Sequence, residues 1–506
     1  MIKHENNIFE LHTNNSSLVL EAAQNGQLLM LFYGKRIEVP GDGIRCPLSF
    51  RQEYATGNTI SYEDDNLSFA QEDYCFAVAG NGKGDVRESL YEITDKKGFK
   101  TFDFKYDGFE ILKKKPCLGQ MPSAYGESET LVISLKDSFH KVLMKLNFTV
   151  FEDTDVITRS TVLINESEND FTVNKLLSNL TDFDRNDFTV MHFHGSWASE
   201  MNEENTPVSS AGLTLGSRTG TSSSRCNPLF FLKASDCTLD HGEVYGFNLV
   251  YSGDHFAGIQ CDHFGRTRVV NGLSPFNFSY ALKPGDSLYS PEAVLAYSDE
   301  GLNGITDVMH RFVNEHIVRG AWKNKERPIL INSWEASYFN FTENSLLRLA
   351  KEAAVCGIEL FVLDDGWFGE RDSDSKSLGD WVVNKKKLPG GLKSFAEKLK
   401  AMGLKFGIWV EPEMVNEDSD LYRAHPEWAI KAPEASHSKG RNQMILDLTN
   451  PKVREYIIDS MTEVFSSADI SYVKWDMNRN FSDYYSNYLE GRQGELGYRY
   501  YEGFYS

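Results

Sequence analysis

The feature that most constrains the fold of this chain is an alternation of short apolar runs with amphipathic segments, which begins at about residue 326. The apolar runs read, in order, PILINSW, IELFVLDDGW, LKFGIWVEPEM and ISYVKWD, and MILDL is a candidate for a short extra strand. The segments between them have helical spacing; Thr342 is a predicted N-cap, and Asn450 precedes Pro451 at another predicted helix start. Continuously apolar strands that alternate with helices predict a parallel sheet covered by helices. A (β/α)8 barrel is favoured over a doubly wound sheet, because no glycine-rich phosphate loop follows any strand.

The first 300 residues have the period of strands instead. KLNFTVFEDTDVITRSTVLIN alternates and is rich in β-branched and aromatic residues, and Asn25-Gly26 between two apolar runs predicts a hairpin. Repeated short runs of this kind predict a large β-sandwich. Apolar residues at helical spacing over 302–318 predict a helix after it. The predicted organisation is a β-sandwich domain over 1–300, a linking helix over 301–325 and the first half of a (β/α)8 barrel over 326–506.

Composition excludes several classes of partner. The net charge of −21 argues against nucleic acids and anionic membrane surfaces as binding partners. No stretch approaches the roughly 18 apolar residues of a membrane span, and the first residues lack the apolar core of a signal peptide. The seven cysteines are scattered and form no C-x-x-C pair. We therefore expect a cytoplasmic protein without a disulfide framework or a zinc site.

Polar and aromatic residues gather at the ends of all four predicted barrel strands. They are Asn332 and Trp334; Asp364, Asp365 and Trp367; Trp409, Glu411 and Glu413; and Lys474, Asp476 and Asn478. The carboxyl ends of barrel strands carry the active site in barrel enzymes. The pattern therefore predicts an active site at this edge of the sheet.

Several carboxylates at a barrel mouth support two chemistries: a divalent metal held by oxygen ligands, or glycoside hydrolysis by paired carboxylates. The tryptophans near the strand ends (Trp334, Trp367, Trp381, Trp409) favour a sugar, because a pyranose offers apolar C–H faces to indole rings. Lys474 would compete with a metal ion. Beside Asp476 on one face of a strand, it would instead keep that carboxyl ionised, as a nucleophile requires.

Long motifs then match a known family. The segments VLDDGWFGERDSDSKSLGDWVVNKKKLPGGL, GIWVEPEMVNEDSDLYRAHPEWAI, GRNQMILDLTNPKVREYI and YVKWDMNRN resemble the α-galactosidases of glycoside hydrolase family 36. In the first half of the chain, GSWASEMNEENTPVSSAGLTLGSRTGTSSSRCNPLFFL resembles the family's N-terminal β-supersandwich, and GNGKGDVRESLYEI resembles its G-D-x-R loop. The resemblance covers most of residues 80–506. It implies a β-supersandwich followed by a (β/α)8 barrel.

The resemblance also implies roles for individual residues. Asp476 matches the catalytic nucleophile, which forms a galactosyl ester with net retention. Asp364 and Asp365 match the pair that grips galactose hydroxyls. The remaining implied substrate contacts are Trp334, Trp409, Arg441, Lys474 and Asn478.

For the assembly, the resemblance implies a homo-oligomer that acts on α-galactoside oligosaccharides without a cofactor or a metal. In tetrameric members of the family the G-D-x-R loop reaches a neighbouring active site. Asp85 and Arg87 are therefore candidates for contacts at an outer subsite, with an ordinary ion pair as the alternative.

The chain departs from the family's pattern at one point. The second carboxylate of the retaining pair, the acid/base, lies downstream of the nucleophile in the family, and no match to that segment occurs up to residue 506. Residues 326–506 are also fewer than the roughly 250 of a complete barrel. We therefore expect a half barrel with an exposed strand edge and weak hydrolysis of melibiose or raffinose.

Three alternatives remain open at this point. Glu411, Glu413 or Asp483 could replace the missing acid. The chain could be an α-N-acetylgalactosaminidase or a galactosyl-transferring relative. It could also be a catalytically impaired homologue that serves only as a sugar-binding or assembly protein.

Overall fold

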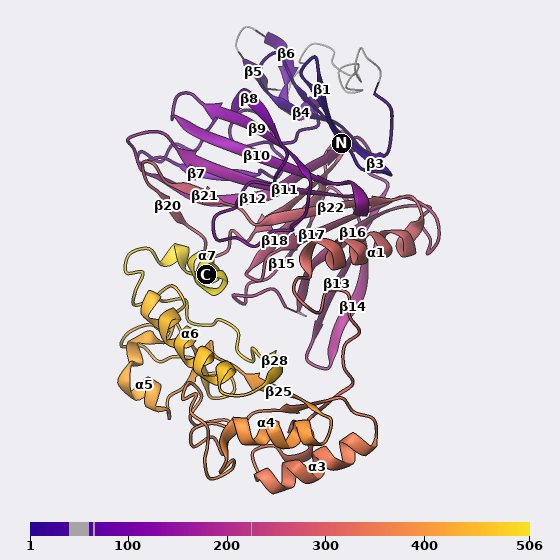
Figure 1. Cartoon of the computed structure of the whole chain (residues 1–506). Coiled ribbons are helices and arrows are strands. Elements are labelled where there is room, and N and C mark those ends of the chain that lie inside the picture. Colours follow the sequence, from indigo (N-terminus) through magenta and orange to yellow (C-terminus); the bar gives the residue numbers. More distant parts are fainter. Residues whose placement is uncertain (40–59, 64–65, 224) are drawn as a thin grey trace. The chain divides into compact units, whose positions relative to one another are not determined.

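The computed structural model describes residues 1–39, 60–63, 66–223 and 225–506. The chain forms two compact units, one over residues 1–323 and the other over residues 324–504 (Figure 1). We call the first the β unit and the second the α/β unit. In the described parts of the chain, no helix is both long enough and apolar enough to cross a bilayer.

The β unit consists almost entirely of antiparallel strands. Its strands are β1 (Ile2–Glu5), β2 (Ile8–His12), β3 (Ser16–Ala22), β4 (Leu28–Lys35), β5 (Ser61–Glu63), β6 (Asn66–Ala70), β7 (Tyr91–Thr94), β8 (Lys105–Leu112), β9 (Glu129–Asp137), β10 (Val142–Phe151), β11 (Val156–Asn165), β12 (Phe171–Phe183), β13 (Phe188–Ser196), β14 (Ser199–Pro207), β15 (Leu213–Gly216), β16 (Cys226–Ala234), β17 (Val244–Val250), β18 (His255–Cys261), β19 (Thr267–Leu273), β20 (Tyr280–Leu282), β21 (Ser287–Tyr289) and β22 (Glu292–Ser298). Two 3-10 turns, η2 (Gln71–Asp73) and η3 (Glu152–Thr154), interrupt them.

Two large sheets form the sandwich. The ten-stranded sheet has the order β14-β13-β16-β17-β22-β11-β10-β9-β8, with β21 paired to β11. The six-stranded sheet has the order β15-β18-β19-β12-β20, with β7 paired to β12. The sheets contact each other through β11 and β12 and through β17, β22 and β19. A four-stranded sheet, β1 to β4, contacts the sandwich through β4, and β5 pairs with β6. The predicted β-sandwich is confirmed.

The hairpins lie where turn residues interrupt apolar runs. β3 and β4 pair antiparallel on either side of Asn25-Gly26, and Gly26 has a φ of +83°, which favours glycine. β10 and β11 pair along their whole lengths across a turn in which Asp155 has a φ of +59°. The alternation in this segment therefore encodes two long antiparallel strands.

A helix covers part of the ten-stranded sheet. Helix α1 (Gly301–Phe312) contacts β17 and β22, and a π-helical turn, η4 (Val313–Ile317), continues it. Its apolar face buries Ile305, Met309 and Phe312 against Val244 and Val294 of the sheet. This packing places the predicted helix within the β unit.

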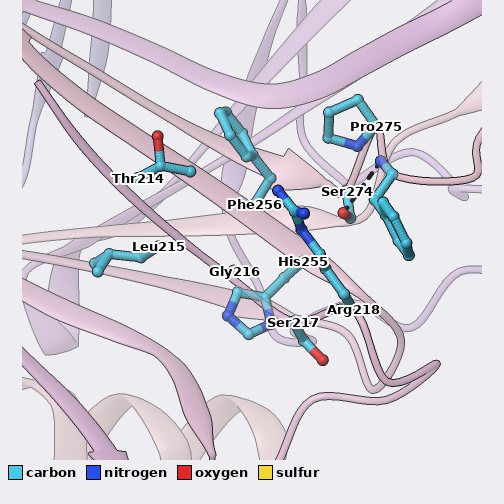
Figure 2. Close-up of a pocket in the computed structure, with 10 residues that line it drawn as sticks. Thr214, Leu215, Gly216, Ser217, Arg218, His255, Phe256, Ser274 and Pro275 are labelled. Carbon is cyan, nitrogen blue, oxygen red and sulfur yellow. Dashed lines mark hydrogen bonds between the residues drawn. The ribbon is translucent and has the colours of Figure 1, made fainter.

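The β unit also holds a pocket of about 390 Å³ between β15, β18 and the residues that follow β19 (Figure 2). Arg218 lies over the ring of Phe276, with its guanidinium carbon 5.0 Å from the ring centroid. His255, which also lines the pocket, is 3% exposed, and burial lowers its pKa to about 4. Its imidazole is therefore neutral at physiological pH.

The α/β unit is built on a parallel sheet. The strands β23 (Leu330–Asn332), β24 (Leu360–Leu363), β25 (Lys405–Val410) and β28 (Ile470–Trp475) are all parallel and follow one another in chain order. The helices between them are α2 (Trp334–Ser337), α3 (Glu343–Val355), α4 (Gly391–Ala401), α5 (Asp420–Ala424) and α6 (Pro451–Ser466), and α7 (Leu496–Tyr505) follows β28. Two 3-10 turns are η5 (Pro426–Trp428) and η6 (Gln493–Glu495). A parallel sheet in chain order with intervening helices is the arrangement of part of a (β/α)8 barrel, so the predicted fold class is confirmed.

The helix signals are also confirmed. Thr342 caps α3 by accepting from the Ser345 backbone N–H, and the Ser345 hydroxyl accepts from the Thr342 backbone N–H in return. Asn450 caps α6, with Pro451 at the first helical position. The apolar faces of these helices are buried. Leu346, Ala350 and Ala353 are buried on α3, and Leu392, Phe395 and Leu399 on α4.

The extra strand that MILDL suggested is not part of the parallel sheet. β27 (Gln443–Ile445) pairs antiparallel with β26 (Met414–Asn416) in a separate two-stranded sheet. The run is apolar because the residues of both strands are fully buried. β28, at one end of the parallel order, exposes Tyr472, Val473 and Trp475 by 38%, 37% and 46%.

Candidate active site

The residues that follow the four parallel strands meet at one edge of the sheet. Asn332, at the end of β23, donates from Nδ2 to Asp364 Oδ2 over 2.5 Å. Lys474, from β28, places its Nζ 2.9 Å from the same oxygen. The carboxylate of Asp364, just after β24, therefore joins the ends of three strands. This convergence was predicted from the sequence, because the carboxyl ends of parallel strands share one edge.

Asp476 is held by neutral donors. Its Oδ2 accepts from Trp409 Nε1 over 3.0 Å and from Asn478 Nδ2 over 2.8 Å, and its Oδ1 accepts from the Met477 backbone N–H over 3.1 Å. The backbone N–H of Asp476 donates to the carbonyl of Val410. These contacts fix the direction of the carboxylate and leave Oδ1 with spare acceptor capacity.

The expected pairing of Lys474 with Asp476 is wrong. Lys474 forms its ion pair with Asp364 instead. The sequence argument assumed an extended chain through both residues, in which alternate side chains share a face. β28 ends at Trp475, so Asp476 lies just beyond the strand and no longer follows that alternation.

The two adjacent carboxylates of the D-D-G-W motif have different partners. Asp365 makes a bidentate ion pair with Arg371, with Nε–Oδ1 and Nη2–Oδ2 distances of 2.9 and 2.8 Å. Arg371 is fully buried and also donates to Asn416 Oδ1. Each Asp365 oxygen is therefore already engaged, whereas Asp364 faces Lys474 and Asn332. Sequence reasoning missed Arg371, although a cation six residues after Asp365 was a usable signal.

Three of the four tryptophans near the strand ends are core residues. Trp367, Trp381 and Trp409 are 0%, 5% and 2% exposed, and their ring centroids lie 4.5 to 6.4 Å from one another or from that of Phe368. The expectation that these rings line a sugar pocket is therefore wrong for Trp367 and Trp381, which are buried against each other and against Phe368. Trp409 contributes its Nε1–H to Asp476 rather than an open ring face. Trp334, which is half-buried, packs edge-on against Tyr338 and Phe339.

Glu411 lies beside the proposed nucleophile. Its Oε1 accepts from the Asn478 backbone N–H over 2.7 Å, so it fixes the residue whose side chain holds Asp476. Glu411 is 1% exposed. Burial raises its pKa to about 7, and the nearby charge of Asp476 adds to the rise while the hydrogen bond from Asn478 opposes it. A carboxyl with this pKa can hold a proton at neutral pH.

Gln443 supplies the second contact of Glu411. Its Nε2 lies 3.0 Å from Glu411 Oε2, and its own Oε1 is buried without a hydrogen-bond partner in the described chain. A rotation of the amide by half a turn exchanges the two atoms, and Oε1 would then accept a hydrogen bond from the O–H of a neutral Glu411. The orphan oxygen therefore fits a protonated Glu411. Sequence reasoning did not single out Gln443, although it lies within the GRNQMILDLTNPKVREYI segment.

The other two candidate acids face elsewhere. Glu413 accepts from Trp475 Nε1 over 2.9 Å and from the Tyr500 hydroxyl over 2.8 Å, and burial raises its pKa. Asp483 accepts from the Ser438 backbone N–H and lies 3.9 Å from Arg479. Of the three carboxylates considered as a replacement acid, only Glu411 shares a hydrogen-bond partner with Asp476.

Arg441 lies at the tip of a tight turn. Arg441 and Asn442, between the bridged residues Gly440 and Gln443, have φ angles of +51° and +59°. Two successive positive φ angles are those of a type I′ turn, which disfavours side chains other than those of glycine, asparagine and aspartate. Arg441 is exposed, and its side chain makes no hydrogen bond or ion pair with the described residues.

Asp85 and Arg87 lie in the β unit, within a buried network of charges. Arg87 donates to both oxygens of Asp85 over 2.8 and 2.9 Å, and Arg268 bridges Asp85 and Asp182 over 2.9 and 2.7 Å. Asp85 and Arg87 are each 6% exposed, whereas Val86 between them is 78% exposed. The loop is therefore anchored by its charged residues. A role of Asp85 and Arg87 at an outer subsite stays a prediction.

Comparison with known proteins assigns both units. The model of the glycosyl hydrolase family 36 N-terminal domain matches residues 26–283, and the Melibiase model matches residues 287–506. Alpha-galactosidase AgaA of Geobacillus stearothermophilus is 40% identical over 98% of this chain and 68% of its own length.

Solved structures agree with the sequence comparison. The structure of family 36 alpha-galactosidase AgaB from Geobacillus stearothermophilus covers 100% of this chain with a TM-score of 0.96 and 38% identity, and the match spans 70% of that chain. An AgaA variant solved in complex with raffinose gives a TM-score of 0.95 at 39% identity over 98% of this chain and 69% of that one. This chain therefore spans about two thirds of the length of these proteins.

Fold, site and comparisons together define the chain as a glycoside hydrolase built from a β-sandwich and barrel strands. It belongs to glycoside hydrolase family 36, and its relatives there are α-galactosidases.

Proposed function

We propose that this α-galactosidase removes terminal α-galactosyl residues from oligosaccharides such as melibiose and raffinose with net retention, and that Asp476 is its nucleophile. In the first step a carboxylate oxygen of Asp476 attacks the anomeric carbon, the bond to the leaving oxygen breaks, and that oxygen takes up a proton from the solvent. Water then attacks the anomeric carbon of the galactosyl ester, the bond to Asp476 breaks, and the water loses a proton to the solvent, which releases galactose and the free carboxylate. The observation that carries the proposal is the fixed carboxylate of Asp476, which Trp409 and Asn478 hold by Oδ2 while Oδ1 keeps a free lone pair.

The neighbouring residues suit the recognition of galactose. Asp364 offers hydroxyl acceptors and Lys474 offers donors, and their 2.9 Å ion pair keeps both in place. Arg441 presents a free guanidinium, and Trp334 supplies an aromatic edge. In the proposed site Asp365, which Arg371 holds by two hydrogen bonds, contacts galactose hydroxyls together with Asp364.

The substrate class is supported by relatives. Variants of AgaA have been solved in complex with raffinose and with stachyose. Both sugars carry terminal α-galactosyl residues, so we propose the same class for this chain. The comparisons do not favour an α-N-acetylgalactosaminidase, because the relatives bear the name alpha-galactosidase.

We also propose a homo-oligomer in a reducing, cytoplasmic compartment. The exposed Val86, held between two buried charged residues, supports a loop that is preformed for contact with another subunit. Five cysteines (Cys117, Cys226, Cys237, Cys261 and Cys356) form no disulfide with the described residues, which supports a reducing environment. Size-exclusion chromatography with light scattering tests the oligomer: a monomer would contradict it.

Trapping the covalent intermediate tests the nucleophile. The full chain is incubated with a fluorinated galactosyl fluoride, whose leaving group needs no proton, and digested for mass spectrometry. We expect the sugar on the peptide that contains Asp476. The Asp476→Asn variant should remain unlabelled, and Asp483→Asn, a matched change of a carboxylate seven residues away, should be labelled like the parent chain.

The same material separates hydrolysis from sugar binding alone. If calorimetry shows galactose binding but no ester forms, the chain is a sugar-binding protein and the proposed hydrolysis is wrong. Label on another residue would contradict the assignment of Asp476 alone.

A further inference from the structure

We propose that the β13–β14 hairpin of the β unit carries a binding site for a divalent transition-metal ion, formed by His192, His194 and Glu204, with Zn²⁺ as the best-matched ion. One ligand atom from each of these three side chains lies within 4.8 Å of the other two. The site is independent of the proposed glycosidase function. Sequence analysis predicted no metal ligands, because the carboxylate lies ten residues beyond the nearer histidine.

The hairpin register brings the three side chains together. His192 on β13 pairs directly with Glu204 on β14, and side chains of such antiparallel partners point to the same face of the sheet. His194 lies two residues along β13, so it shares that face as well. Its Nδ1 is 3.6 Å from Glu204 Oε2.

The spacing fits one ion after a small adjustment. Zinc binds histidine nitrogen and carboxylate oxygen at about 2.0–2.2 Å, so two ligands of one ion are at most about 4.2 Å apart. The observed spread of up to 4.8 Å exceeds this by only a few tenths of an ångström. His194 and Glu204 are exposed and can close that difference by side-chain rotation, whereas His192 is 8% exposed and fixed.

His192 has the arrangement of a prepared ligand. Its Nε2 is 3.3 Å from the Thr206 hydroxyl, two residues beyond Glu204 on β14. A neutral ring that carries its proton on Nε2 donates a hydrogen bond to Thr206 and keeps the lone pair on Nδ1. Nδ1 makes no hydrogen bond within the described chain. A hydrogen bond made by the ring nitrogen that does not bind the ion fixes the tautomer of metal-bound histidines.

The local charge favours a cation. β14 reads SEMNEENTP, with three glutamates and no lysine or arginine, and β13 reads FTVMHFHGS, with no charged residue other than histidine. Two imidazoles and one carboxylate form a donor set that suits zinc and related borderline ions rather than magnesium or calcium. Water would complete the coordination of the ion.

The position suggests what the ion would do. β14 is an edge strand of the ten-stranded sheet, and an edge strand is paired with a neighbour on one side only. An ion held by two residues of β13 and one of β14 would tie this edge strand to its neighbour. The site is therefore structural, and its loading should stabilise the β unit.

Cobalt substitution tests the site in the full chain. The protein is treated with EDTA, dialysed and titrated with Co²⁺, whose visible absorption reports its ligands. We expect saturation at one equivalent, with an absorption of the nitrogen and oxygen type. Glu204→Gln and His194→Asn, both at exposed positions, should each weaken Co²⁺ binding at least tenfold.

Two matched variants serve as controls. Glu203→Gln removes the same charge from the adjacent residue, whose side chain lies on the opposite face of β14, and His310→Asn removes an exposed histidine from α1. Both should bind Co²⁺ like the parent chain. Equal losses in the control and site variants would show general electrostatic attraction only, and unchanged binding in the site variants would overturn the proposal. A strong thiolate-to-cobalt band would assign the ion to cysteines and overturn it as well.

Thermal unfolding gives an independent readout. A ligand that binds only the folded state raises the melting temperature. Excess Zn²⁺ should raise it for the parent chain and for Glu203→Gln but not for Glu204→Gln. Circular dichroism of the metal-free variants verifies that each is folded, and an equal response of both glutamate variants to Zn²⁺ would contradict the site.

Discussion

Asp85 of the β unit and Glu411 of the α/β unit are both buried carboxyl groups, with exposures of 6% and 1%, yet their proton affinities shift in opposite directions. Burial alone would raise the pKa of both. At Asp85, the guanidinium groups of Arg268 and Arg87 outweigh burial and lower the pKa. At Glu411, burial and the nearby Asp476 raise the pKa to about 7, and the hydrogen-bond donors around it are neutral.

The difference separates a structural use of buried charge from a chemical one. The network around Asp85 pairs each of its carboxylates with guanidinium groups and is closed to solvent. At the strand ends, Lys474 is 38% exposed and Asp476 has only neutral donors, so groups there keep capacity for a ligand. Charged side chains at the ends of the parallel strands that are not fully paired with opposite charges are therefore the feature that distinguishes the functional site.

The largest expected effect comes from breaking the closed network. Arg268→Met removes the cation that bridges Asp85 and Asp182 over 2.9 and 2.7 Å and leaves both carboxylates buried. Loss of one partner of a buried ion pair typically costs about 3–5 kcal/mol, so the free energy of unfolding should fall by that amount in urea. Lys35→Met removes a lysine from an exposed pair with Asp299, where solvent screens the charges, and should lower the free energy of unfolding far less than Arg268→Met. Equal falls in the free energy of unfolding of the two variants would refute the prediction that the buried pair stabilises the chain more than the exposed pair does.

The second prediction concerns the pH dependence of stability. Glu411 has a pKa of about 7 in the folded chain against an ordinary value of 4.5. Between these two values the folded chain keeps a proton that the unfolded chain has released. The free energy of unfolding should therefore fall as pH rises from 4.5 to about 7, by on the order of 3 kcal/mol from this residue.

Glu411→Gln isolates that contribution, because glutamine cannot ionise and can still meet Gln443. Urea unfolding at several pH values should show a smaller decline with pH in the variant than in the parent chain. Glu397→Gln, at an exposed position on α4, should leave the decline unchanged. If the free energy of unfolding of Glu411→Gln declines with pH as steeply as that of the parent chain, Glu411 is ionised throughout this pH range and the prediction is wrong.

A smaller effect is expected from Lys474. Lys474→Met leaves Asp364 with Asn332 as its remaining side-chain donor and removes a cation that should face the sugar. A hydrogen bond to a charged group is worth about 1.5–3 kcal/mol, and partial exposure of Lys474 favours the lower value. Galactose affinity measured by calorimetry should therefore fall about tenfold. Lys400→Met, in an exposed pair with Asp469, should bind galactose normally, and unaltered affinity in Lys474→Met would remove Lys474 from the site.

Much of the fold was predictable because it depends on local signals. The apolar runs gave the parallel strands, and Thr342 and Asn450 marked helix starts through their own hydrogen bonds. Convergence of the strand ends was also predictable, since it follows from the parallel arrangement. The prediction of an extra barrel strand at MILDL was wrong, because a buried antiparallel strand and a barrel strand have the same apolar composition.

The partners within the site were less predictable. Lys474 pairs with Asp364 rather than with Asp476, because β28 ends between Lys474 and Asp476. A sequence does not locate the end of a strand to within one residue. Arg371 lies in a loop and Gln443 begins the short strand β27, and the positions of both depend on tertiary packing. The buried tryptophans show the same limit: composition predicts aromatic residues near the site but not which ring faces open space.

The smallest expected effect comes from the backbone conformation of Arg441. Arg441 has a φ of +51°, where a side chain larger than that of glycine or asparagine costs about 1 kcal/mol, and it has no partner in the described chain to compensate. Arg441→Gly should therefore stabilise the chain by roughly 0.5–1 kcal/mol while weakening galactoside binding. Asn442→Gly, at the next position with a φ of +59°, should stabilise less, because asparagine tolerates this conformation, and should leave binding intact. Urea unfolding and calorimetry measure the two effects separately. A gain in stability with undiminished binding in Arg441→Gly would show that the exposed guanidinium serves no purpose at the site.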